Sequence, residues 1–400
     1  MTKPFNGVRV IEVAAWTFVP AAAAILADLG ADVIKVEPPS GDPQRALRNR
    51  LQSEDPDAPN PFLEIPNRGK RSITLDLGTT NGRSVLLELA ATADVFLTSY
   101  LEPVRRKLAI DVDDLRAVND RLVYVRGSGW GPTGPMAERG GFDLAAAWAT
   151  ASMATRMSRG GDEPMWQPSA FYDLLGANTL AGAIGTALFH RAHTEEATVV
   201  DVSLLNVGVW SLGPDLMAAP SAGAQPDRDR SGVSNPIANS YRTSDGRWLY
   251  LVCLQADRFW SELCQLIGRE DLADDVRFRD SRNRATNAVE CIRELDETFS
   301  QRTLSEWDDV LAPFSGVWAP ALEPIELQSH LQVDANGYLA TGHTITGREY
   351  RLPAPPMQFG GPVRPAGPAP EAGQHTEEVL LELGRSWDEI SELRTTGALG

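Results

Sequence analysis

Short β-branched segments alternate with helix-forming segments through residues 1–130, and this alternation constrains the fold more than any other feature of the chain. The second β-branched segment, DVIKVE, stops at Pro38-Pro39, which a central strand does not tolerate. Strands that alternate with helices are joined by right-handed crossovers, so the pattern predicts an α/β fold with a parallel sheet covered by helices. The predicted strands are 8–13, 32–37, 72–77, 94–98 and 122–126, and the predicted helices between them are 21–29, 82–93 and 113–118.

The pattern changes after residue 126. A Gly/Pro-rich loop, GSGWGPTGP, occupies 127–135, and the sequence SYRTSDGRWLYLV further on predicts a hairpin with Asp245-Gly246 as its turn. This hairpin opens a small α+β lobe that extends to about residue 319. Further helices are predicted at 142–156, 173–192, 257–266, 287–301 and 376–383, and a further strand at 197–206.

The net charge of the chain and the motifs that it lacks exclude several classes of function. A net charge of −17 disfavours nucleic acid and anionic membranes as partners, so an anionic ligand must meet local Lys and Arg side chains. No GxGxxG follows the first strand, which disfavours a nicotinamide oxidoreductase. The three cysteines and five histidines form no ligand set, so no metal is expected. No signal peptide and no apolar run of about 18 residues occurs, so a cytoplasmic protein is expected.

An ordered series of strings, from about Val8 to the C-terminus, resembles the class III CoA-transferase family, also called the CaiB/BaiF family. The strings are GVRVIEV, ADLGADVIKVEPPSGD, NRGKRSITLDL, RLVYVRGSGWGPTGP with GGFD, SNPIANSYRTSDGRWLYL and GQHTEEVL. The resemblance implies an interlocked homodimer, in which each subunit has a Rossmann-like large domain formed by both chain ends and a smaller α+β domain. The corresponding segments are 1–212 for the N-terminal part of the large domain, 213–231 for a linker, 232–322 for the small domain, and 323–400 for the return linker and the C-terminal part of the large domain.

The resemblance also implies a catalytic nucleophile, Asp173, at the start of a helix rich in small residues. A carboxylate that attacks a thioester gives a mixed anhydride and then an aspartyl-CoA thioester, which an acceptor carboxylate opens. Unpaired amides at a helix N-terminus favour the ionised carboxylate, whereas burial raises its pKa. Considered without the resemblance, an Asp at this place is more often a helix cap.

Coenzyme A carries phosphates, so its site needs cations and backbone donors. By resemblance, Lys107 falls at an arginine of the family, and Ser99 and Tyr100 fall near the pantetheine arm. Some relatives carry an arginine where this chain has Pro38, so the adenine end must be held differently, for example by Arg45 or Lys107. A solvated surface charge is an equally good interpretation of each basic residue. The full set of candidate CoA-binding residues is Arg45, Arg68, Lys70, Arg71, Ser99, Tyr100, Arg105 and Lys107.

The first loop lies beside the acyl site in related proteins. Oxalate-handling relatives have a glutamine where this chain has Thr17, and Trp16 and Phe18 make the surroundings bulkier and more apolar. These aromatics favour a bulky apolar acyl group, although ordinary core packing would explain them as well. Gly131, in the Gly/Pro-rich loop, and Phe142 are the other candidate substrate-binding residues.

Two alternatives to the transferase remain. An α-methylacyl-CoA racemase shares the fold but needs a histidine in a GHD-type segment, where this chain has Gly141-Phe142-Asp143, and a phenylalanine cannot move a proton. A non-catalytic CoA-binding homologue is also open, because fold does not guarantee function. Under the main hypothesis CoA and acyl-CoA are substrates, a carboxylic acid is the acceptor, and no cofactor stays bound.

Overall fold

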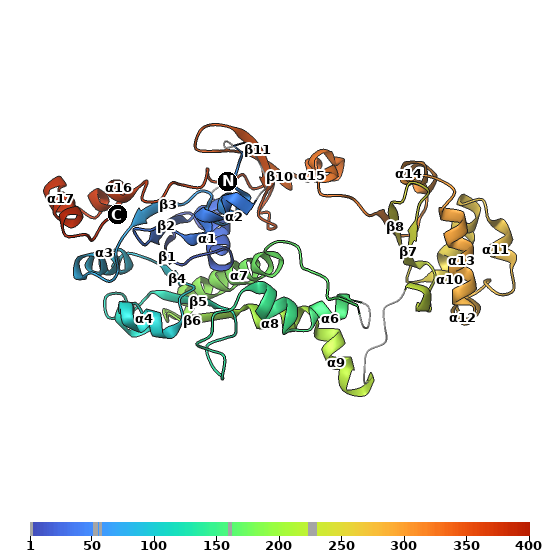
Figure 1. Ribbon diagram of the computed structural model, residues 1–400, viewed down its shortest axis with the longest axis horizontal. Helices are drawn as coiled ribbons and strands as arrows, with labels where there is room; N and C mark the ends of the chain where they lie inside the picture. The colour runs from blue at the N-terminus through green and yellow to red at the C-terminus, as the bar shows by residue number, and fades with distance from the viewer. Residues whose placement is uncertain (1–2, 51–54, 56–57, 159–161, 223–229) are drawn as a thin grey trace. The chain divides into compact units, whose positions relative to one another are not determined.

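The computed structural model describes residues 3–50, 55, 58–158, 162–222 and 230–400. These residues form two compact units. The first holds the described residues up to Ala222, except Asp162, together with His330–Gly400. The second holds Asp162 and the described residues between Gly223 and Ser329. The first unit is therefore built from two stretches of chain that are far apart in the sequence (Figure 1).

A parallel six-stranded sheet is the centre of the first unit, as the alternation of segments predicts. Its strand order is β3-β2-β1-β4-β5-β6, so the order reverses between β1 and β4. All five neighbouring pairs are parallel. The strands are β1 (Arg9–Val13), β2 (Asp32–Glu37), β3 (Arg71–Thr74), β4 (Val95–Thr98), β5 (Val123–Ser128) and β6 (Val199–Ser203).

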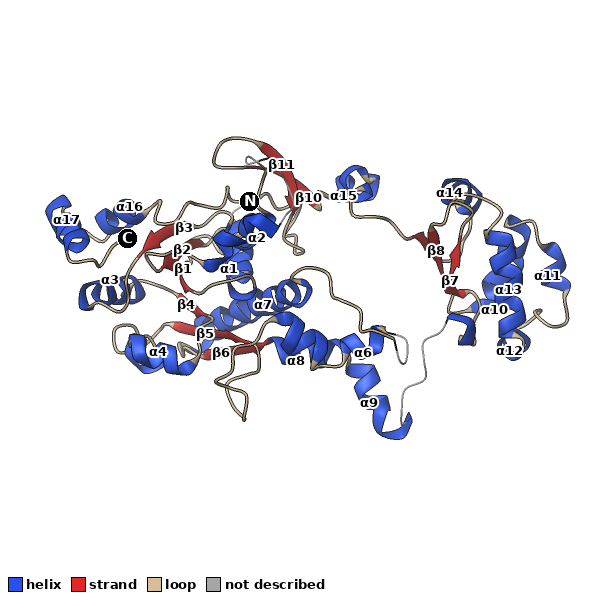
Figure 2. Cartoon of the chain, in the orientation of Figure 1, coloured by secondary structure: helices blue, strands red, loops and turns tan. Residues whose placement is uncertain are grey.

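Apolar side chains alternate between the two faces of this sheet, and helices cover both (Figure 2). In β1, Val10 joins the core beneath α1 (Phe18–Asp28) and α7 (Phe171–Thr194), whereas Ile11 joins the core beneath α3 (Thr80–Ala91). Strands buried on both faces are typical of parallel sheets. The unit's other helices are α2 (Pro61–Asn67), α4 (Glu102–Leu108), α5 (Val112–Arg116), α8 (Leu204–Ser211), α9 (Gly213–Ala222), α15 (Leu331–Asn336), α16 (Thr376–Glu382) and α17 (Trp387–Thr395), and a hairpin of β10 (Leu339–His343) and β11 (Glu349–Pro353) joins them.

The last part of the chain completes the second face of the sheet. The His375 N–H donates to the Ser72 carbonyl over 2.8 Å, and the Asp76 N–H donates to the Ala398 carbonyl over 2.9 Å. The helices of this segment add buried apolar side chains to the same core as α3. Those side chains are Val379, Leu380, Ile390 and Leu393.

Four segments differ from the expected elements. The strand expected at 72–77 ends early, at Thr74. The single helix expected at 142–156 is instead a π-helical turn (Leu144–Ala149) followed by α6 (Met153–Met157), because Ser152 has a φ of +70° that breaks the helix. The expected strand at 197–206 ends at Ser203, whose hydroxyl accepts from the Asn206 N–H and caps α8. Residues 213–222, expected in a linker, form α9.

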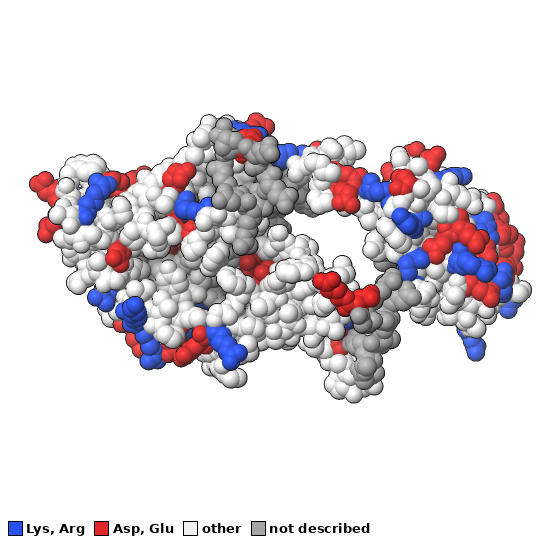
Figure 3. Space-filling view, viewed as in Figure 1, with Lys and Arg blue, Asp and Glu red and all other residues white. Residues whose placement is uncertain are grey.

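The second unit is a small α+β lobe. The hairpin expected around Asp245-Gly246 is confirmed: β7 (Ala238–Arg242) and β8 (Trp248–Val252) are antiparallel, and Gly246 has the positive φ (+80°) that its turn needs. Figure 3 shows acidic and basic side chains mixed over the visible face of this unit. Its other elements are β9 (Trp318–Pro320), α10 (Ala256–Leu266), α11 (Glu270–Asp274), α12 (Ser281–Thr286), α13 (Ala288–Phe299) and α14 (Leu304–Leu311).

The described residues contain neither a membrane-spanning helix nor a metal-binding cluster of side chains. None of the helices there is both long and apolar enough to cross a membrane. No cluster of three or more His, Cys, Asp or Glu side chains in this part of the chain has an arrangement that could hold a metal ion. The three cysteines are free thiols buried in the second unit.

Candidate active site

A cavity of about 180 Å³ lies at the carboxyl ends of β1, β4 and β5, where the strand order reverses. The loops after two adjacent strands diverge at such a reversal, and ligands of open α/β sheets bind in the crevice between them. Residues from the loops after β1, β4 and β5 therefore meet the start of α7 here. The cavity is lined by Ala15, Trp16, Phe18, Ser99, Leu101, Gly127, Ser128, Gly129, Gly140, Gly141, Phe142, Asp173 and Leu204.

Asp173 lies in the first turn of α7 and lines this cavity. The N-cap residue of the helix is Ala170, which has a left-handed φ of +55°. Asp173 does not cap the helix, because no described residue donates a hydrogen bond to its carboxylate. The carboxylate thus faces the cavity without an intramolecular partner among the residues that the structure describes.

Burial, together with the smaller effect of the negative charge of Asp143, raises the pKa of the Asp173 carboxyl to about 8. The Asp143 Oδ1 accepts from the Leu144 N–H over 2.7 Å, and its Oδ2 is buried without a hydrogen-bond partner among the described residues. Two neighbouring carboxyl groups resist simultaneous ionisation. A carboxyl with this pKa exchanges between a neutral form and a poorly solvated carboxylate near pH 8.

Aromatic side chains form the apolar wall of the cavity. The rings of Trp16 and Phe142 meet edge to face, with centroids 5.4 Å apart, and both side chains are partly exposed, by 37% and 58%. The Phe18 ring is buried between two glycines: a Cβ atom on Gly127 would lie 2.9 Å from Phe18 Cε1, and one on Gly176 would lie 2.7 Å from Phe18 Cε2. These glycines give the Phe18 ring its place at the cavity.

The other residues expected at the acyl and thioester ends are divided between the cavity, a neighbouring recess and the interior. Ser99 lines the cavity, and its Oγ accepts from the Ala15 N–H over 3.1 Å. Thr17 is buried outside the cavity, and its Oγ1 accepts from Gln44 Nε2 over 2.8 Å. A recess of about 40 Å³ shares Leu101, Gly127 and Ser128 with the cavity, and Tyr100, Arg105 and Gly131 line it.

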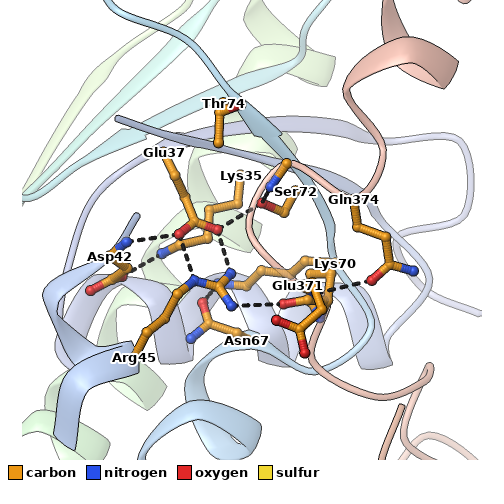
Figure 4. Close-up of polar contacts among 12 residues, drawn as sticks. Lys35, Glu37, Asp42, Arg45, Asn67, Lys70, Ser72, Thr74, Glu371 and Gln374 are labelled. Carbon is orange, nitrogen blue, oxygen red and sulfur yellow. Dashed lines mark hydrogen bonds and ion pairs between the residues drawn. The ribbon is translucent and has the colours of Figure 1, made fainter. Parts of the chain in front are cut away.

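Four of the basic residues expected to bind CoA are ion-paired inside the unit. Arg45 Nη2 lies 2.6 Å from Glu37 Oε1 (Figure 4), and Arg68 Nε lies 2.7 Å from Asp28 Oδ2. Lys70 pairs with Glu12 in a fully buried position, where burial lowers the pKa of Lys70 to about 8. Arg71 pairs with Asp32, Glu378 and Glu382.

The two remaining basic candidates are on α4. Arg105 is buried; its Nε donates to Asp111 over 3.1 Å and its Nη1 donates to the Tyr100 carbonyl over 2.6 Å. Lys107 is exposed and forms no ion pair with another described residue. Among the basic candidates, Lys107 is thus the side chain that a phosphate would reach without breaking an internal contact.

Sequence reasoning did not single out some of the cavity residues. Leu101 and Leu204 add apolar surface, and Ser128 adds a hydroxyl near the cavity. Their signal in the sequence is position: Leu101 follows β4 and Leu204 follows β6, as Trp16 follows β1. Residues that follow strands at a reversal of strand order are the ones that a ligand meets.

The sequence profile of CoA-transferase family III matches residues 5–376. Among curated proteins, the chain is 33% identical to the probable fatty acyl-CoA transferase Rv3272 of Mycobacterium tuberculosis, over 94% of this chain and 98% of that protein. It is 30% identical to the cinnamoyl-CoA:phenyllactate CoA-transferase of Clostridium sporogenes, over 98% of this chain and 96% of that protein. It is also 31% identical to the succinate–glutarate CoA-transferase of Agrobacterium fabrum, over 95% of this chain and 96% of that protein.

Solved structures similar to this chain belong to the same family. The crystal structure of an Asp-to-Ala mutant of Rv3272 superposes with a TM-score of 0.81 at 30% identity, covering 96% of this chain and all of that one. A CAIB/BAIF family protein from Brucella suis superposes with a TM-score of 0.81 at 28% identity, covering 96% of this chain and all of that one.

The parallel sheet, its reversal of strand order and the carboxylate-bearing cavity at that reversal define an α/β protein with a ligand-binding crevice at the carboxyl ends of its strands. More particularly, the chain belongs to CoA-transferase family III, the CaiB/BaiF family, whose members use CoA thioesters as substrates. It is a class III CoA-transferase.

Proposed function

We propose that this enzyme moves CoA from an acyl-CoA to a carboxylic acid through covalent intermediates on Asp173. One observation carries the proposal: Asp173 is the carboxylate that lines the cavity at the reversal of strand order, and no described residue donates a hydrogen bond to it. A carboxylate that is neither capped nor ion-paired is free to attack a bound thioester.

The reaction proceeds in two matched halves. An Asp173 oxygen attacks the thioester carbonyl carbon, the C–S bond breaks, and a mixed anhydride and the CoA thiolate form. The thiolate attacks the aspartyl carbonyl carbon, which releases the donor acid and leaves an aspartyl-CoA thioester. The acceptor carboxylate opens this thioester to a second anhydride, and the thiolate then attacks the acceptor's acyl carbon and regenerates the Asp173 carboxylate. The donor, aspartyl and product thioesters are of similar energy, and the anhydrides are the more reactive, short-lived intermediates between them.

The environment of Asp173 suits this chemistry. In its neutral form the side chain lets a thioester enter an apolar cavity without the repulsion that a fixed negative charge would impose on CoA. Loss of the proton, which the pKa of about 8 places near neutral pH, then yields a nucleophile with little solvation. Backbone N–H groups of four cavity glycines are candidates for binding the oxygen that becomes negative during attack: Gly127, Gly129, Gly140 and Gly141.

We propose that the acyl group of the CoA thioester is bulky and apolar. Trp16, Phe18 and Phe142 supply aromatic surface to the cavity, and Leu101 and Leu204 supply aliphatic surface. Apolar walls with few polar groups select apolar ligands. The names of two relatives, a probable fatty acyl-CoA transferase and a cinnamoyl-CoA:phenyllactate CoA-transferase, agree with this substrate class.

We also propose how the rest of CoA is held. The pantetheine arm runs past Ser99 and Tyr100 into the recess that Arg105 and Gly131 line, and Lys107 meets a phosphate. Arg45, Arg68, Lys70 and Arg71 act indirectly, since their charges are already paired. We further propose that the enzyme is a cytoplasmic interlocked homodimer with no permanently bound cofactor, and that the large domain is formed by both chain ends.

Intact-protein mass spectrometry tests the nucleophile. The wild type is incubated with a panel of acyl-CoAs, with and without hydroxylamine, and is compared with Asp173→Ala. A hydroxylamine-sensitive adduct that maps to Asp173 is expected, and it should vanish in Asp173→Ala together with turnover. Asp388→Ala, which removes an exposed carboxylate from the first turn of α17, is the matched control and should keep the adduct.

The absence of an adduct with every donor, while CoA still binds, would contradict the proposal and favour the α-methylacyl-CoA racemase or the non-catalytic homologue. Deuterium exchange at the α-carbon separates those two. The racemase is disfavoured because the cavity carries Phe142, which cannot transfer a proton, at the place of the expected histidine.

A further inference from the structure

Four consecutive residues after β1 are each held by a different side chain. Lys35 Nζ donates to the Ala14 carbonyl over 3.2 Å, and the Ala15 N–H donates to Ser99 Oγ over 3.1 Å. The Trp16 N–H donates to Asp42 Oδ1 over 3.3 Å, and Gln44 Nε2 donates to Thr17 Oγ1 over 2.8 Å. We call residues 14–17 the Trp16 loop.

The backbone of this loop is held in a conformation that it would not choose freely. Trp16 has a φ of +70°, in the left-handed region that residues other than glycine rarely adopt. Such a conformation persists only where the surroundings over-determine it. The four contacts supply that constraint, and they place the indole of Trp16 in the wall of the cavity, edge to face with Phe142.

The contacts rest on a buried set of charges, part of which Figure 4 shows. Lys35 Nζ lies 2.8 Å from Glu12 Oε1 and 2.8 Å from Asp42 Oδ2, and all three side chains are inaccessible or nearly so. Although burial alone would lower the pKa of Lys35, the carboxylates of Glu12 and Asp42 raise it above its ordinary value. Lys35 therefore stays charged, and it fixes Asp42 from one side.

A hydrogen bond of the Asp42 backbone also holds this residue in place. Its N–H donates to Glu37 Oε2 over 2.8 Å, and Glu37 is in turn held by Arg45 (Figure 4). Its Oδ1 also accepts from the Gln44 N–H over 2.9 Å. One carboxylate thus joins the charged interior to the Trp16 backbone, although it is not among the residues that line the cavity.

We propose that Asp42 is a positioning residue that determines acyl specificity: with Lys35 and Gln44 it holds the Trp16 loop in its strained backbone, and so fixes the indole as a rigid wall against which bulky acyl groups are selected. The specificity part of this inference rests on the proposed function. The positioning part does not, because it concerns the loop alone. A wall of this kind selects by shape, because the backbone that carries the ring is held in place.

The first test follows the indole directly. The protein is labelled with 5-fluorotryptophan, and the Trp16 signal is assigned in the ¹⁹F NMR spectrum by its absence from Trp16→Phe. In Asp42→Asn an amide NH2 group, which cannot accept a hydrogen bond, replaces one of the two carboxylate oxygens. Either the contact with Lys35 or the contact with the Trp16 N–H is then lost, so the Trp16 signal is expected to shift and broaden. Glu64→Gln is the matched control, because it neutralises another buried carboxylate of the same unit, one that contacts Tyr350 and the Ala369 N–H.

The second test measures selectivity. The ratio of kcat/KM for a bulky acyl-CoA to that for acetyl-CoA is expected to fall about tenfold in Asp42→Asn, toward the ratio of Trp16→Ala. In the Trp16→Ala background, Asp42→Asn should change the ratio no further, because the group that Asp42 positions is gone. Glu64→Gln should leave the ratio unchanged.

The results of the two tests distinguish the positioning role of Asp42 from the proposed transferase activity. If Asp42→Asn does not fold, Gln44→Leu, which removes the contact to Thr17 without removing a charge, must shift the Trp16 signal and lower the ratio. An unchanged Trp16 signal in the folded variant would overturn the proposal, as would an equal loss of kcat/KM for both donors. If the wild type transfers CoA from no donor and forms no adduct at Asp173, the proposed function fails, and the ¹⁹F signal still decides whether Asp42 positions the loop.

Discussion

The indole of Trp16 and the ring of Phe142 meet at 89° with their centroids 5.4 Å apart, and together they form one wall of the cavity that contains Asp173. Edge-to-face pairs of this kind stabilise each other by about 0.5–1.5 kcal/mol beyond their buried area. The loop after β1 and the segment before the π-helical turn are therefore coupled at the cavity. Loss of either ring removes surface that a bulky acyl group would contact.

Trp16→Ala is accordingly expected to lose preference for bulky acyl-CoAs while it keeps activity with acetyl-CoA, and Phe142→Ala is expected to do the same to a smaller extent. Steady-state kinetics with a series of acyl-CoAs measures this. Phe189→Ala, which removes an exposed ring from the far end of α7, is the control. An unchanged acyl profile in both cavity variants would count against a bulky acyl substrate.

Adduct formation is expected to follow the ionisation of Asp173. Only the carboxylate attacks, so the single-turnover rate should rise with pH through a midpoint near 8. Asp143→Asn removes the neighbouring negative charge, which lowers the pKa of Asp173 and moves the midpoint to lower pH. Stopped-flow or quench-flow mass spectrometry would follow the adduct. A uniform fall in rate at every pH, without a shift of the midpoint, would indicate that Asp143 acts only through structure.

The same raised pKa predicts how stability depends on pH. Between the ordinary Asp value of 3.8 and about 8, the folded protein holds a proton on Asp173 that the unfolded chain has lost. Folding stability due to this group therefore falls as the pH rises across that window, by at most about 1.4 kcal/mol per pH unit and by less where solvent screens the group. Asp173→Asn has no such group, so its Tm advantage over the wild type should grow from pH 4 to pH 8 and then level off. Equal Tm differences at every pH would contradict this.

Gly176 is expected to tolerate no side chain. A Cβ atom there would lie 2.7 Å from Phe18 Cε2, so Gly176→Ala should displace the Phe18 ring, destabilise the protein by about 1–3 kcal/mol and lower kcat/KM. Gly182→Ala lies on the same helix, and a Cβ atom there would have nothing within 4 Å, so it should stabilise the protein by up to about 1 kcal/mol. Denaturant melts compare the two. Equal effects would show that the contact with Phe18 is not what requires the glycine.

Two basic residues that were grouped together from the sequence are expected to behave oppositely. Arg68→Ala leaves the buried Asp28 carboxylate without its ion pair, which should destabilise the protein by about 3–5 kcal/mol. Lys107→Ala removes an exposed charge, so it should leave Tm unchanged and raise the KM for acyl-CoA several-fold, less so at high salt. Thermal melts and KM values at two salt concentrations test this. A normal KM for Lys107→Ala would remove it from the CoA site.

Much of the fold could be predicted from the sequence, because at many positions the local sequence favours the same secondary structure that the folded protein has. DVIKVE forms a strand at the expected bounds, and Asp245-Gly246 makes the expected turn. The helix break at Ser152 could not be predicted from the sequence, because the alanine-rich sequence around it favours an uninterrupted helix and serine rarely adopts a positive φ.

The site was accessible in part. Asp173 and the aromatics adjoin recognisable strings, and the structure brings Asp173, Trp16, Phe18, Ser99 and Phe142 to one cavity. The ion-pair partners of the basic residues could not be predicted, because a sequence shows which side chains are charged but not which are buried. Arg68, for example, pairs with Asp28, which lies forty positions earlier in the chain. The same holds for Asp42, whose role depends on a backbone N–H of a distant loop.

The strands of the first unit's sheet are synthesised long before the C-terminal helices that cover one of its faces. All six strands have been made once the ribosome passes Ser203, yet the side chains that close one face, from Val379 to Leu393, are translated after the whole second unit. A nascent chain of this protein therefore carries an open apolar surface through much of its synthesis, a condition that favours chaperone binding and aggregation. The second unit, whose residues are nearly continuous, has no such delay and is free to fold first.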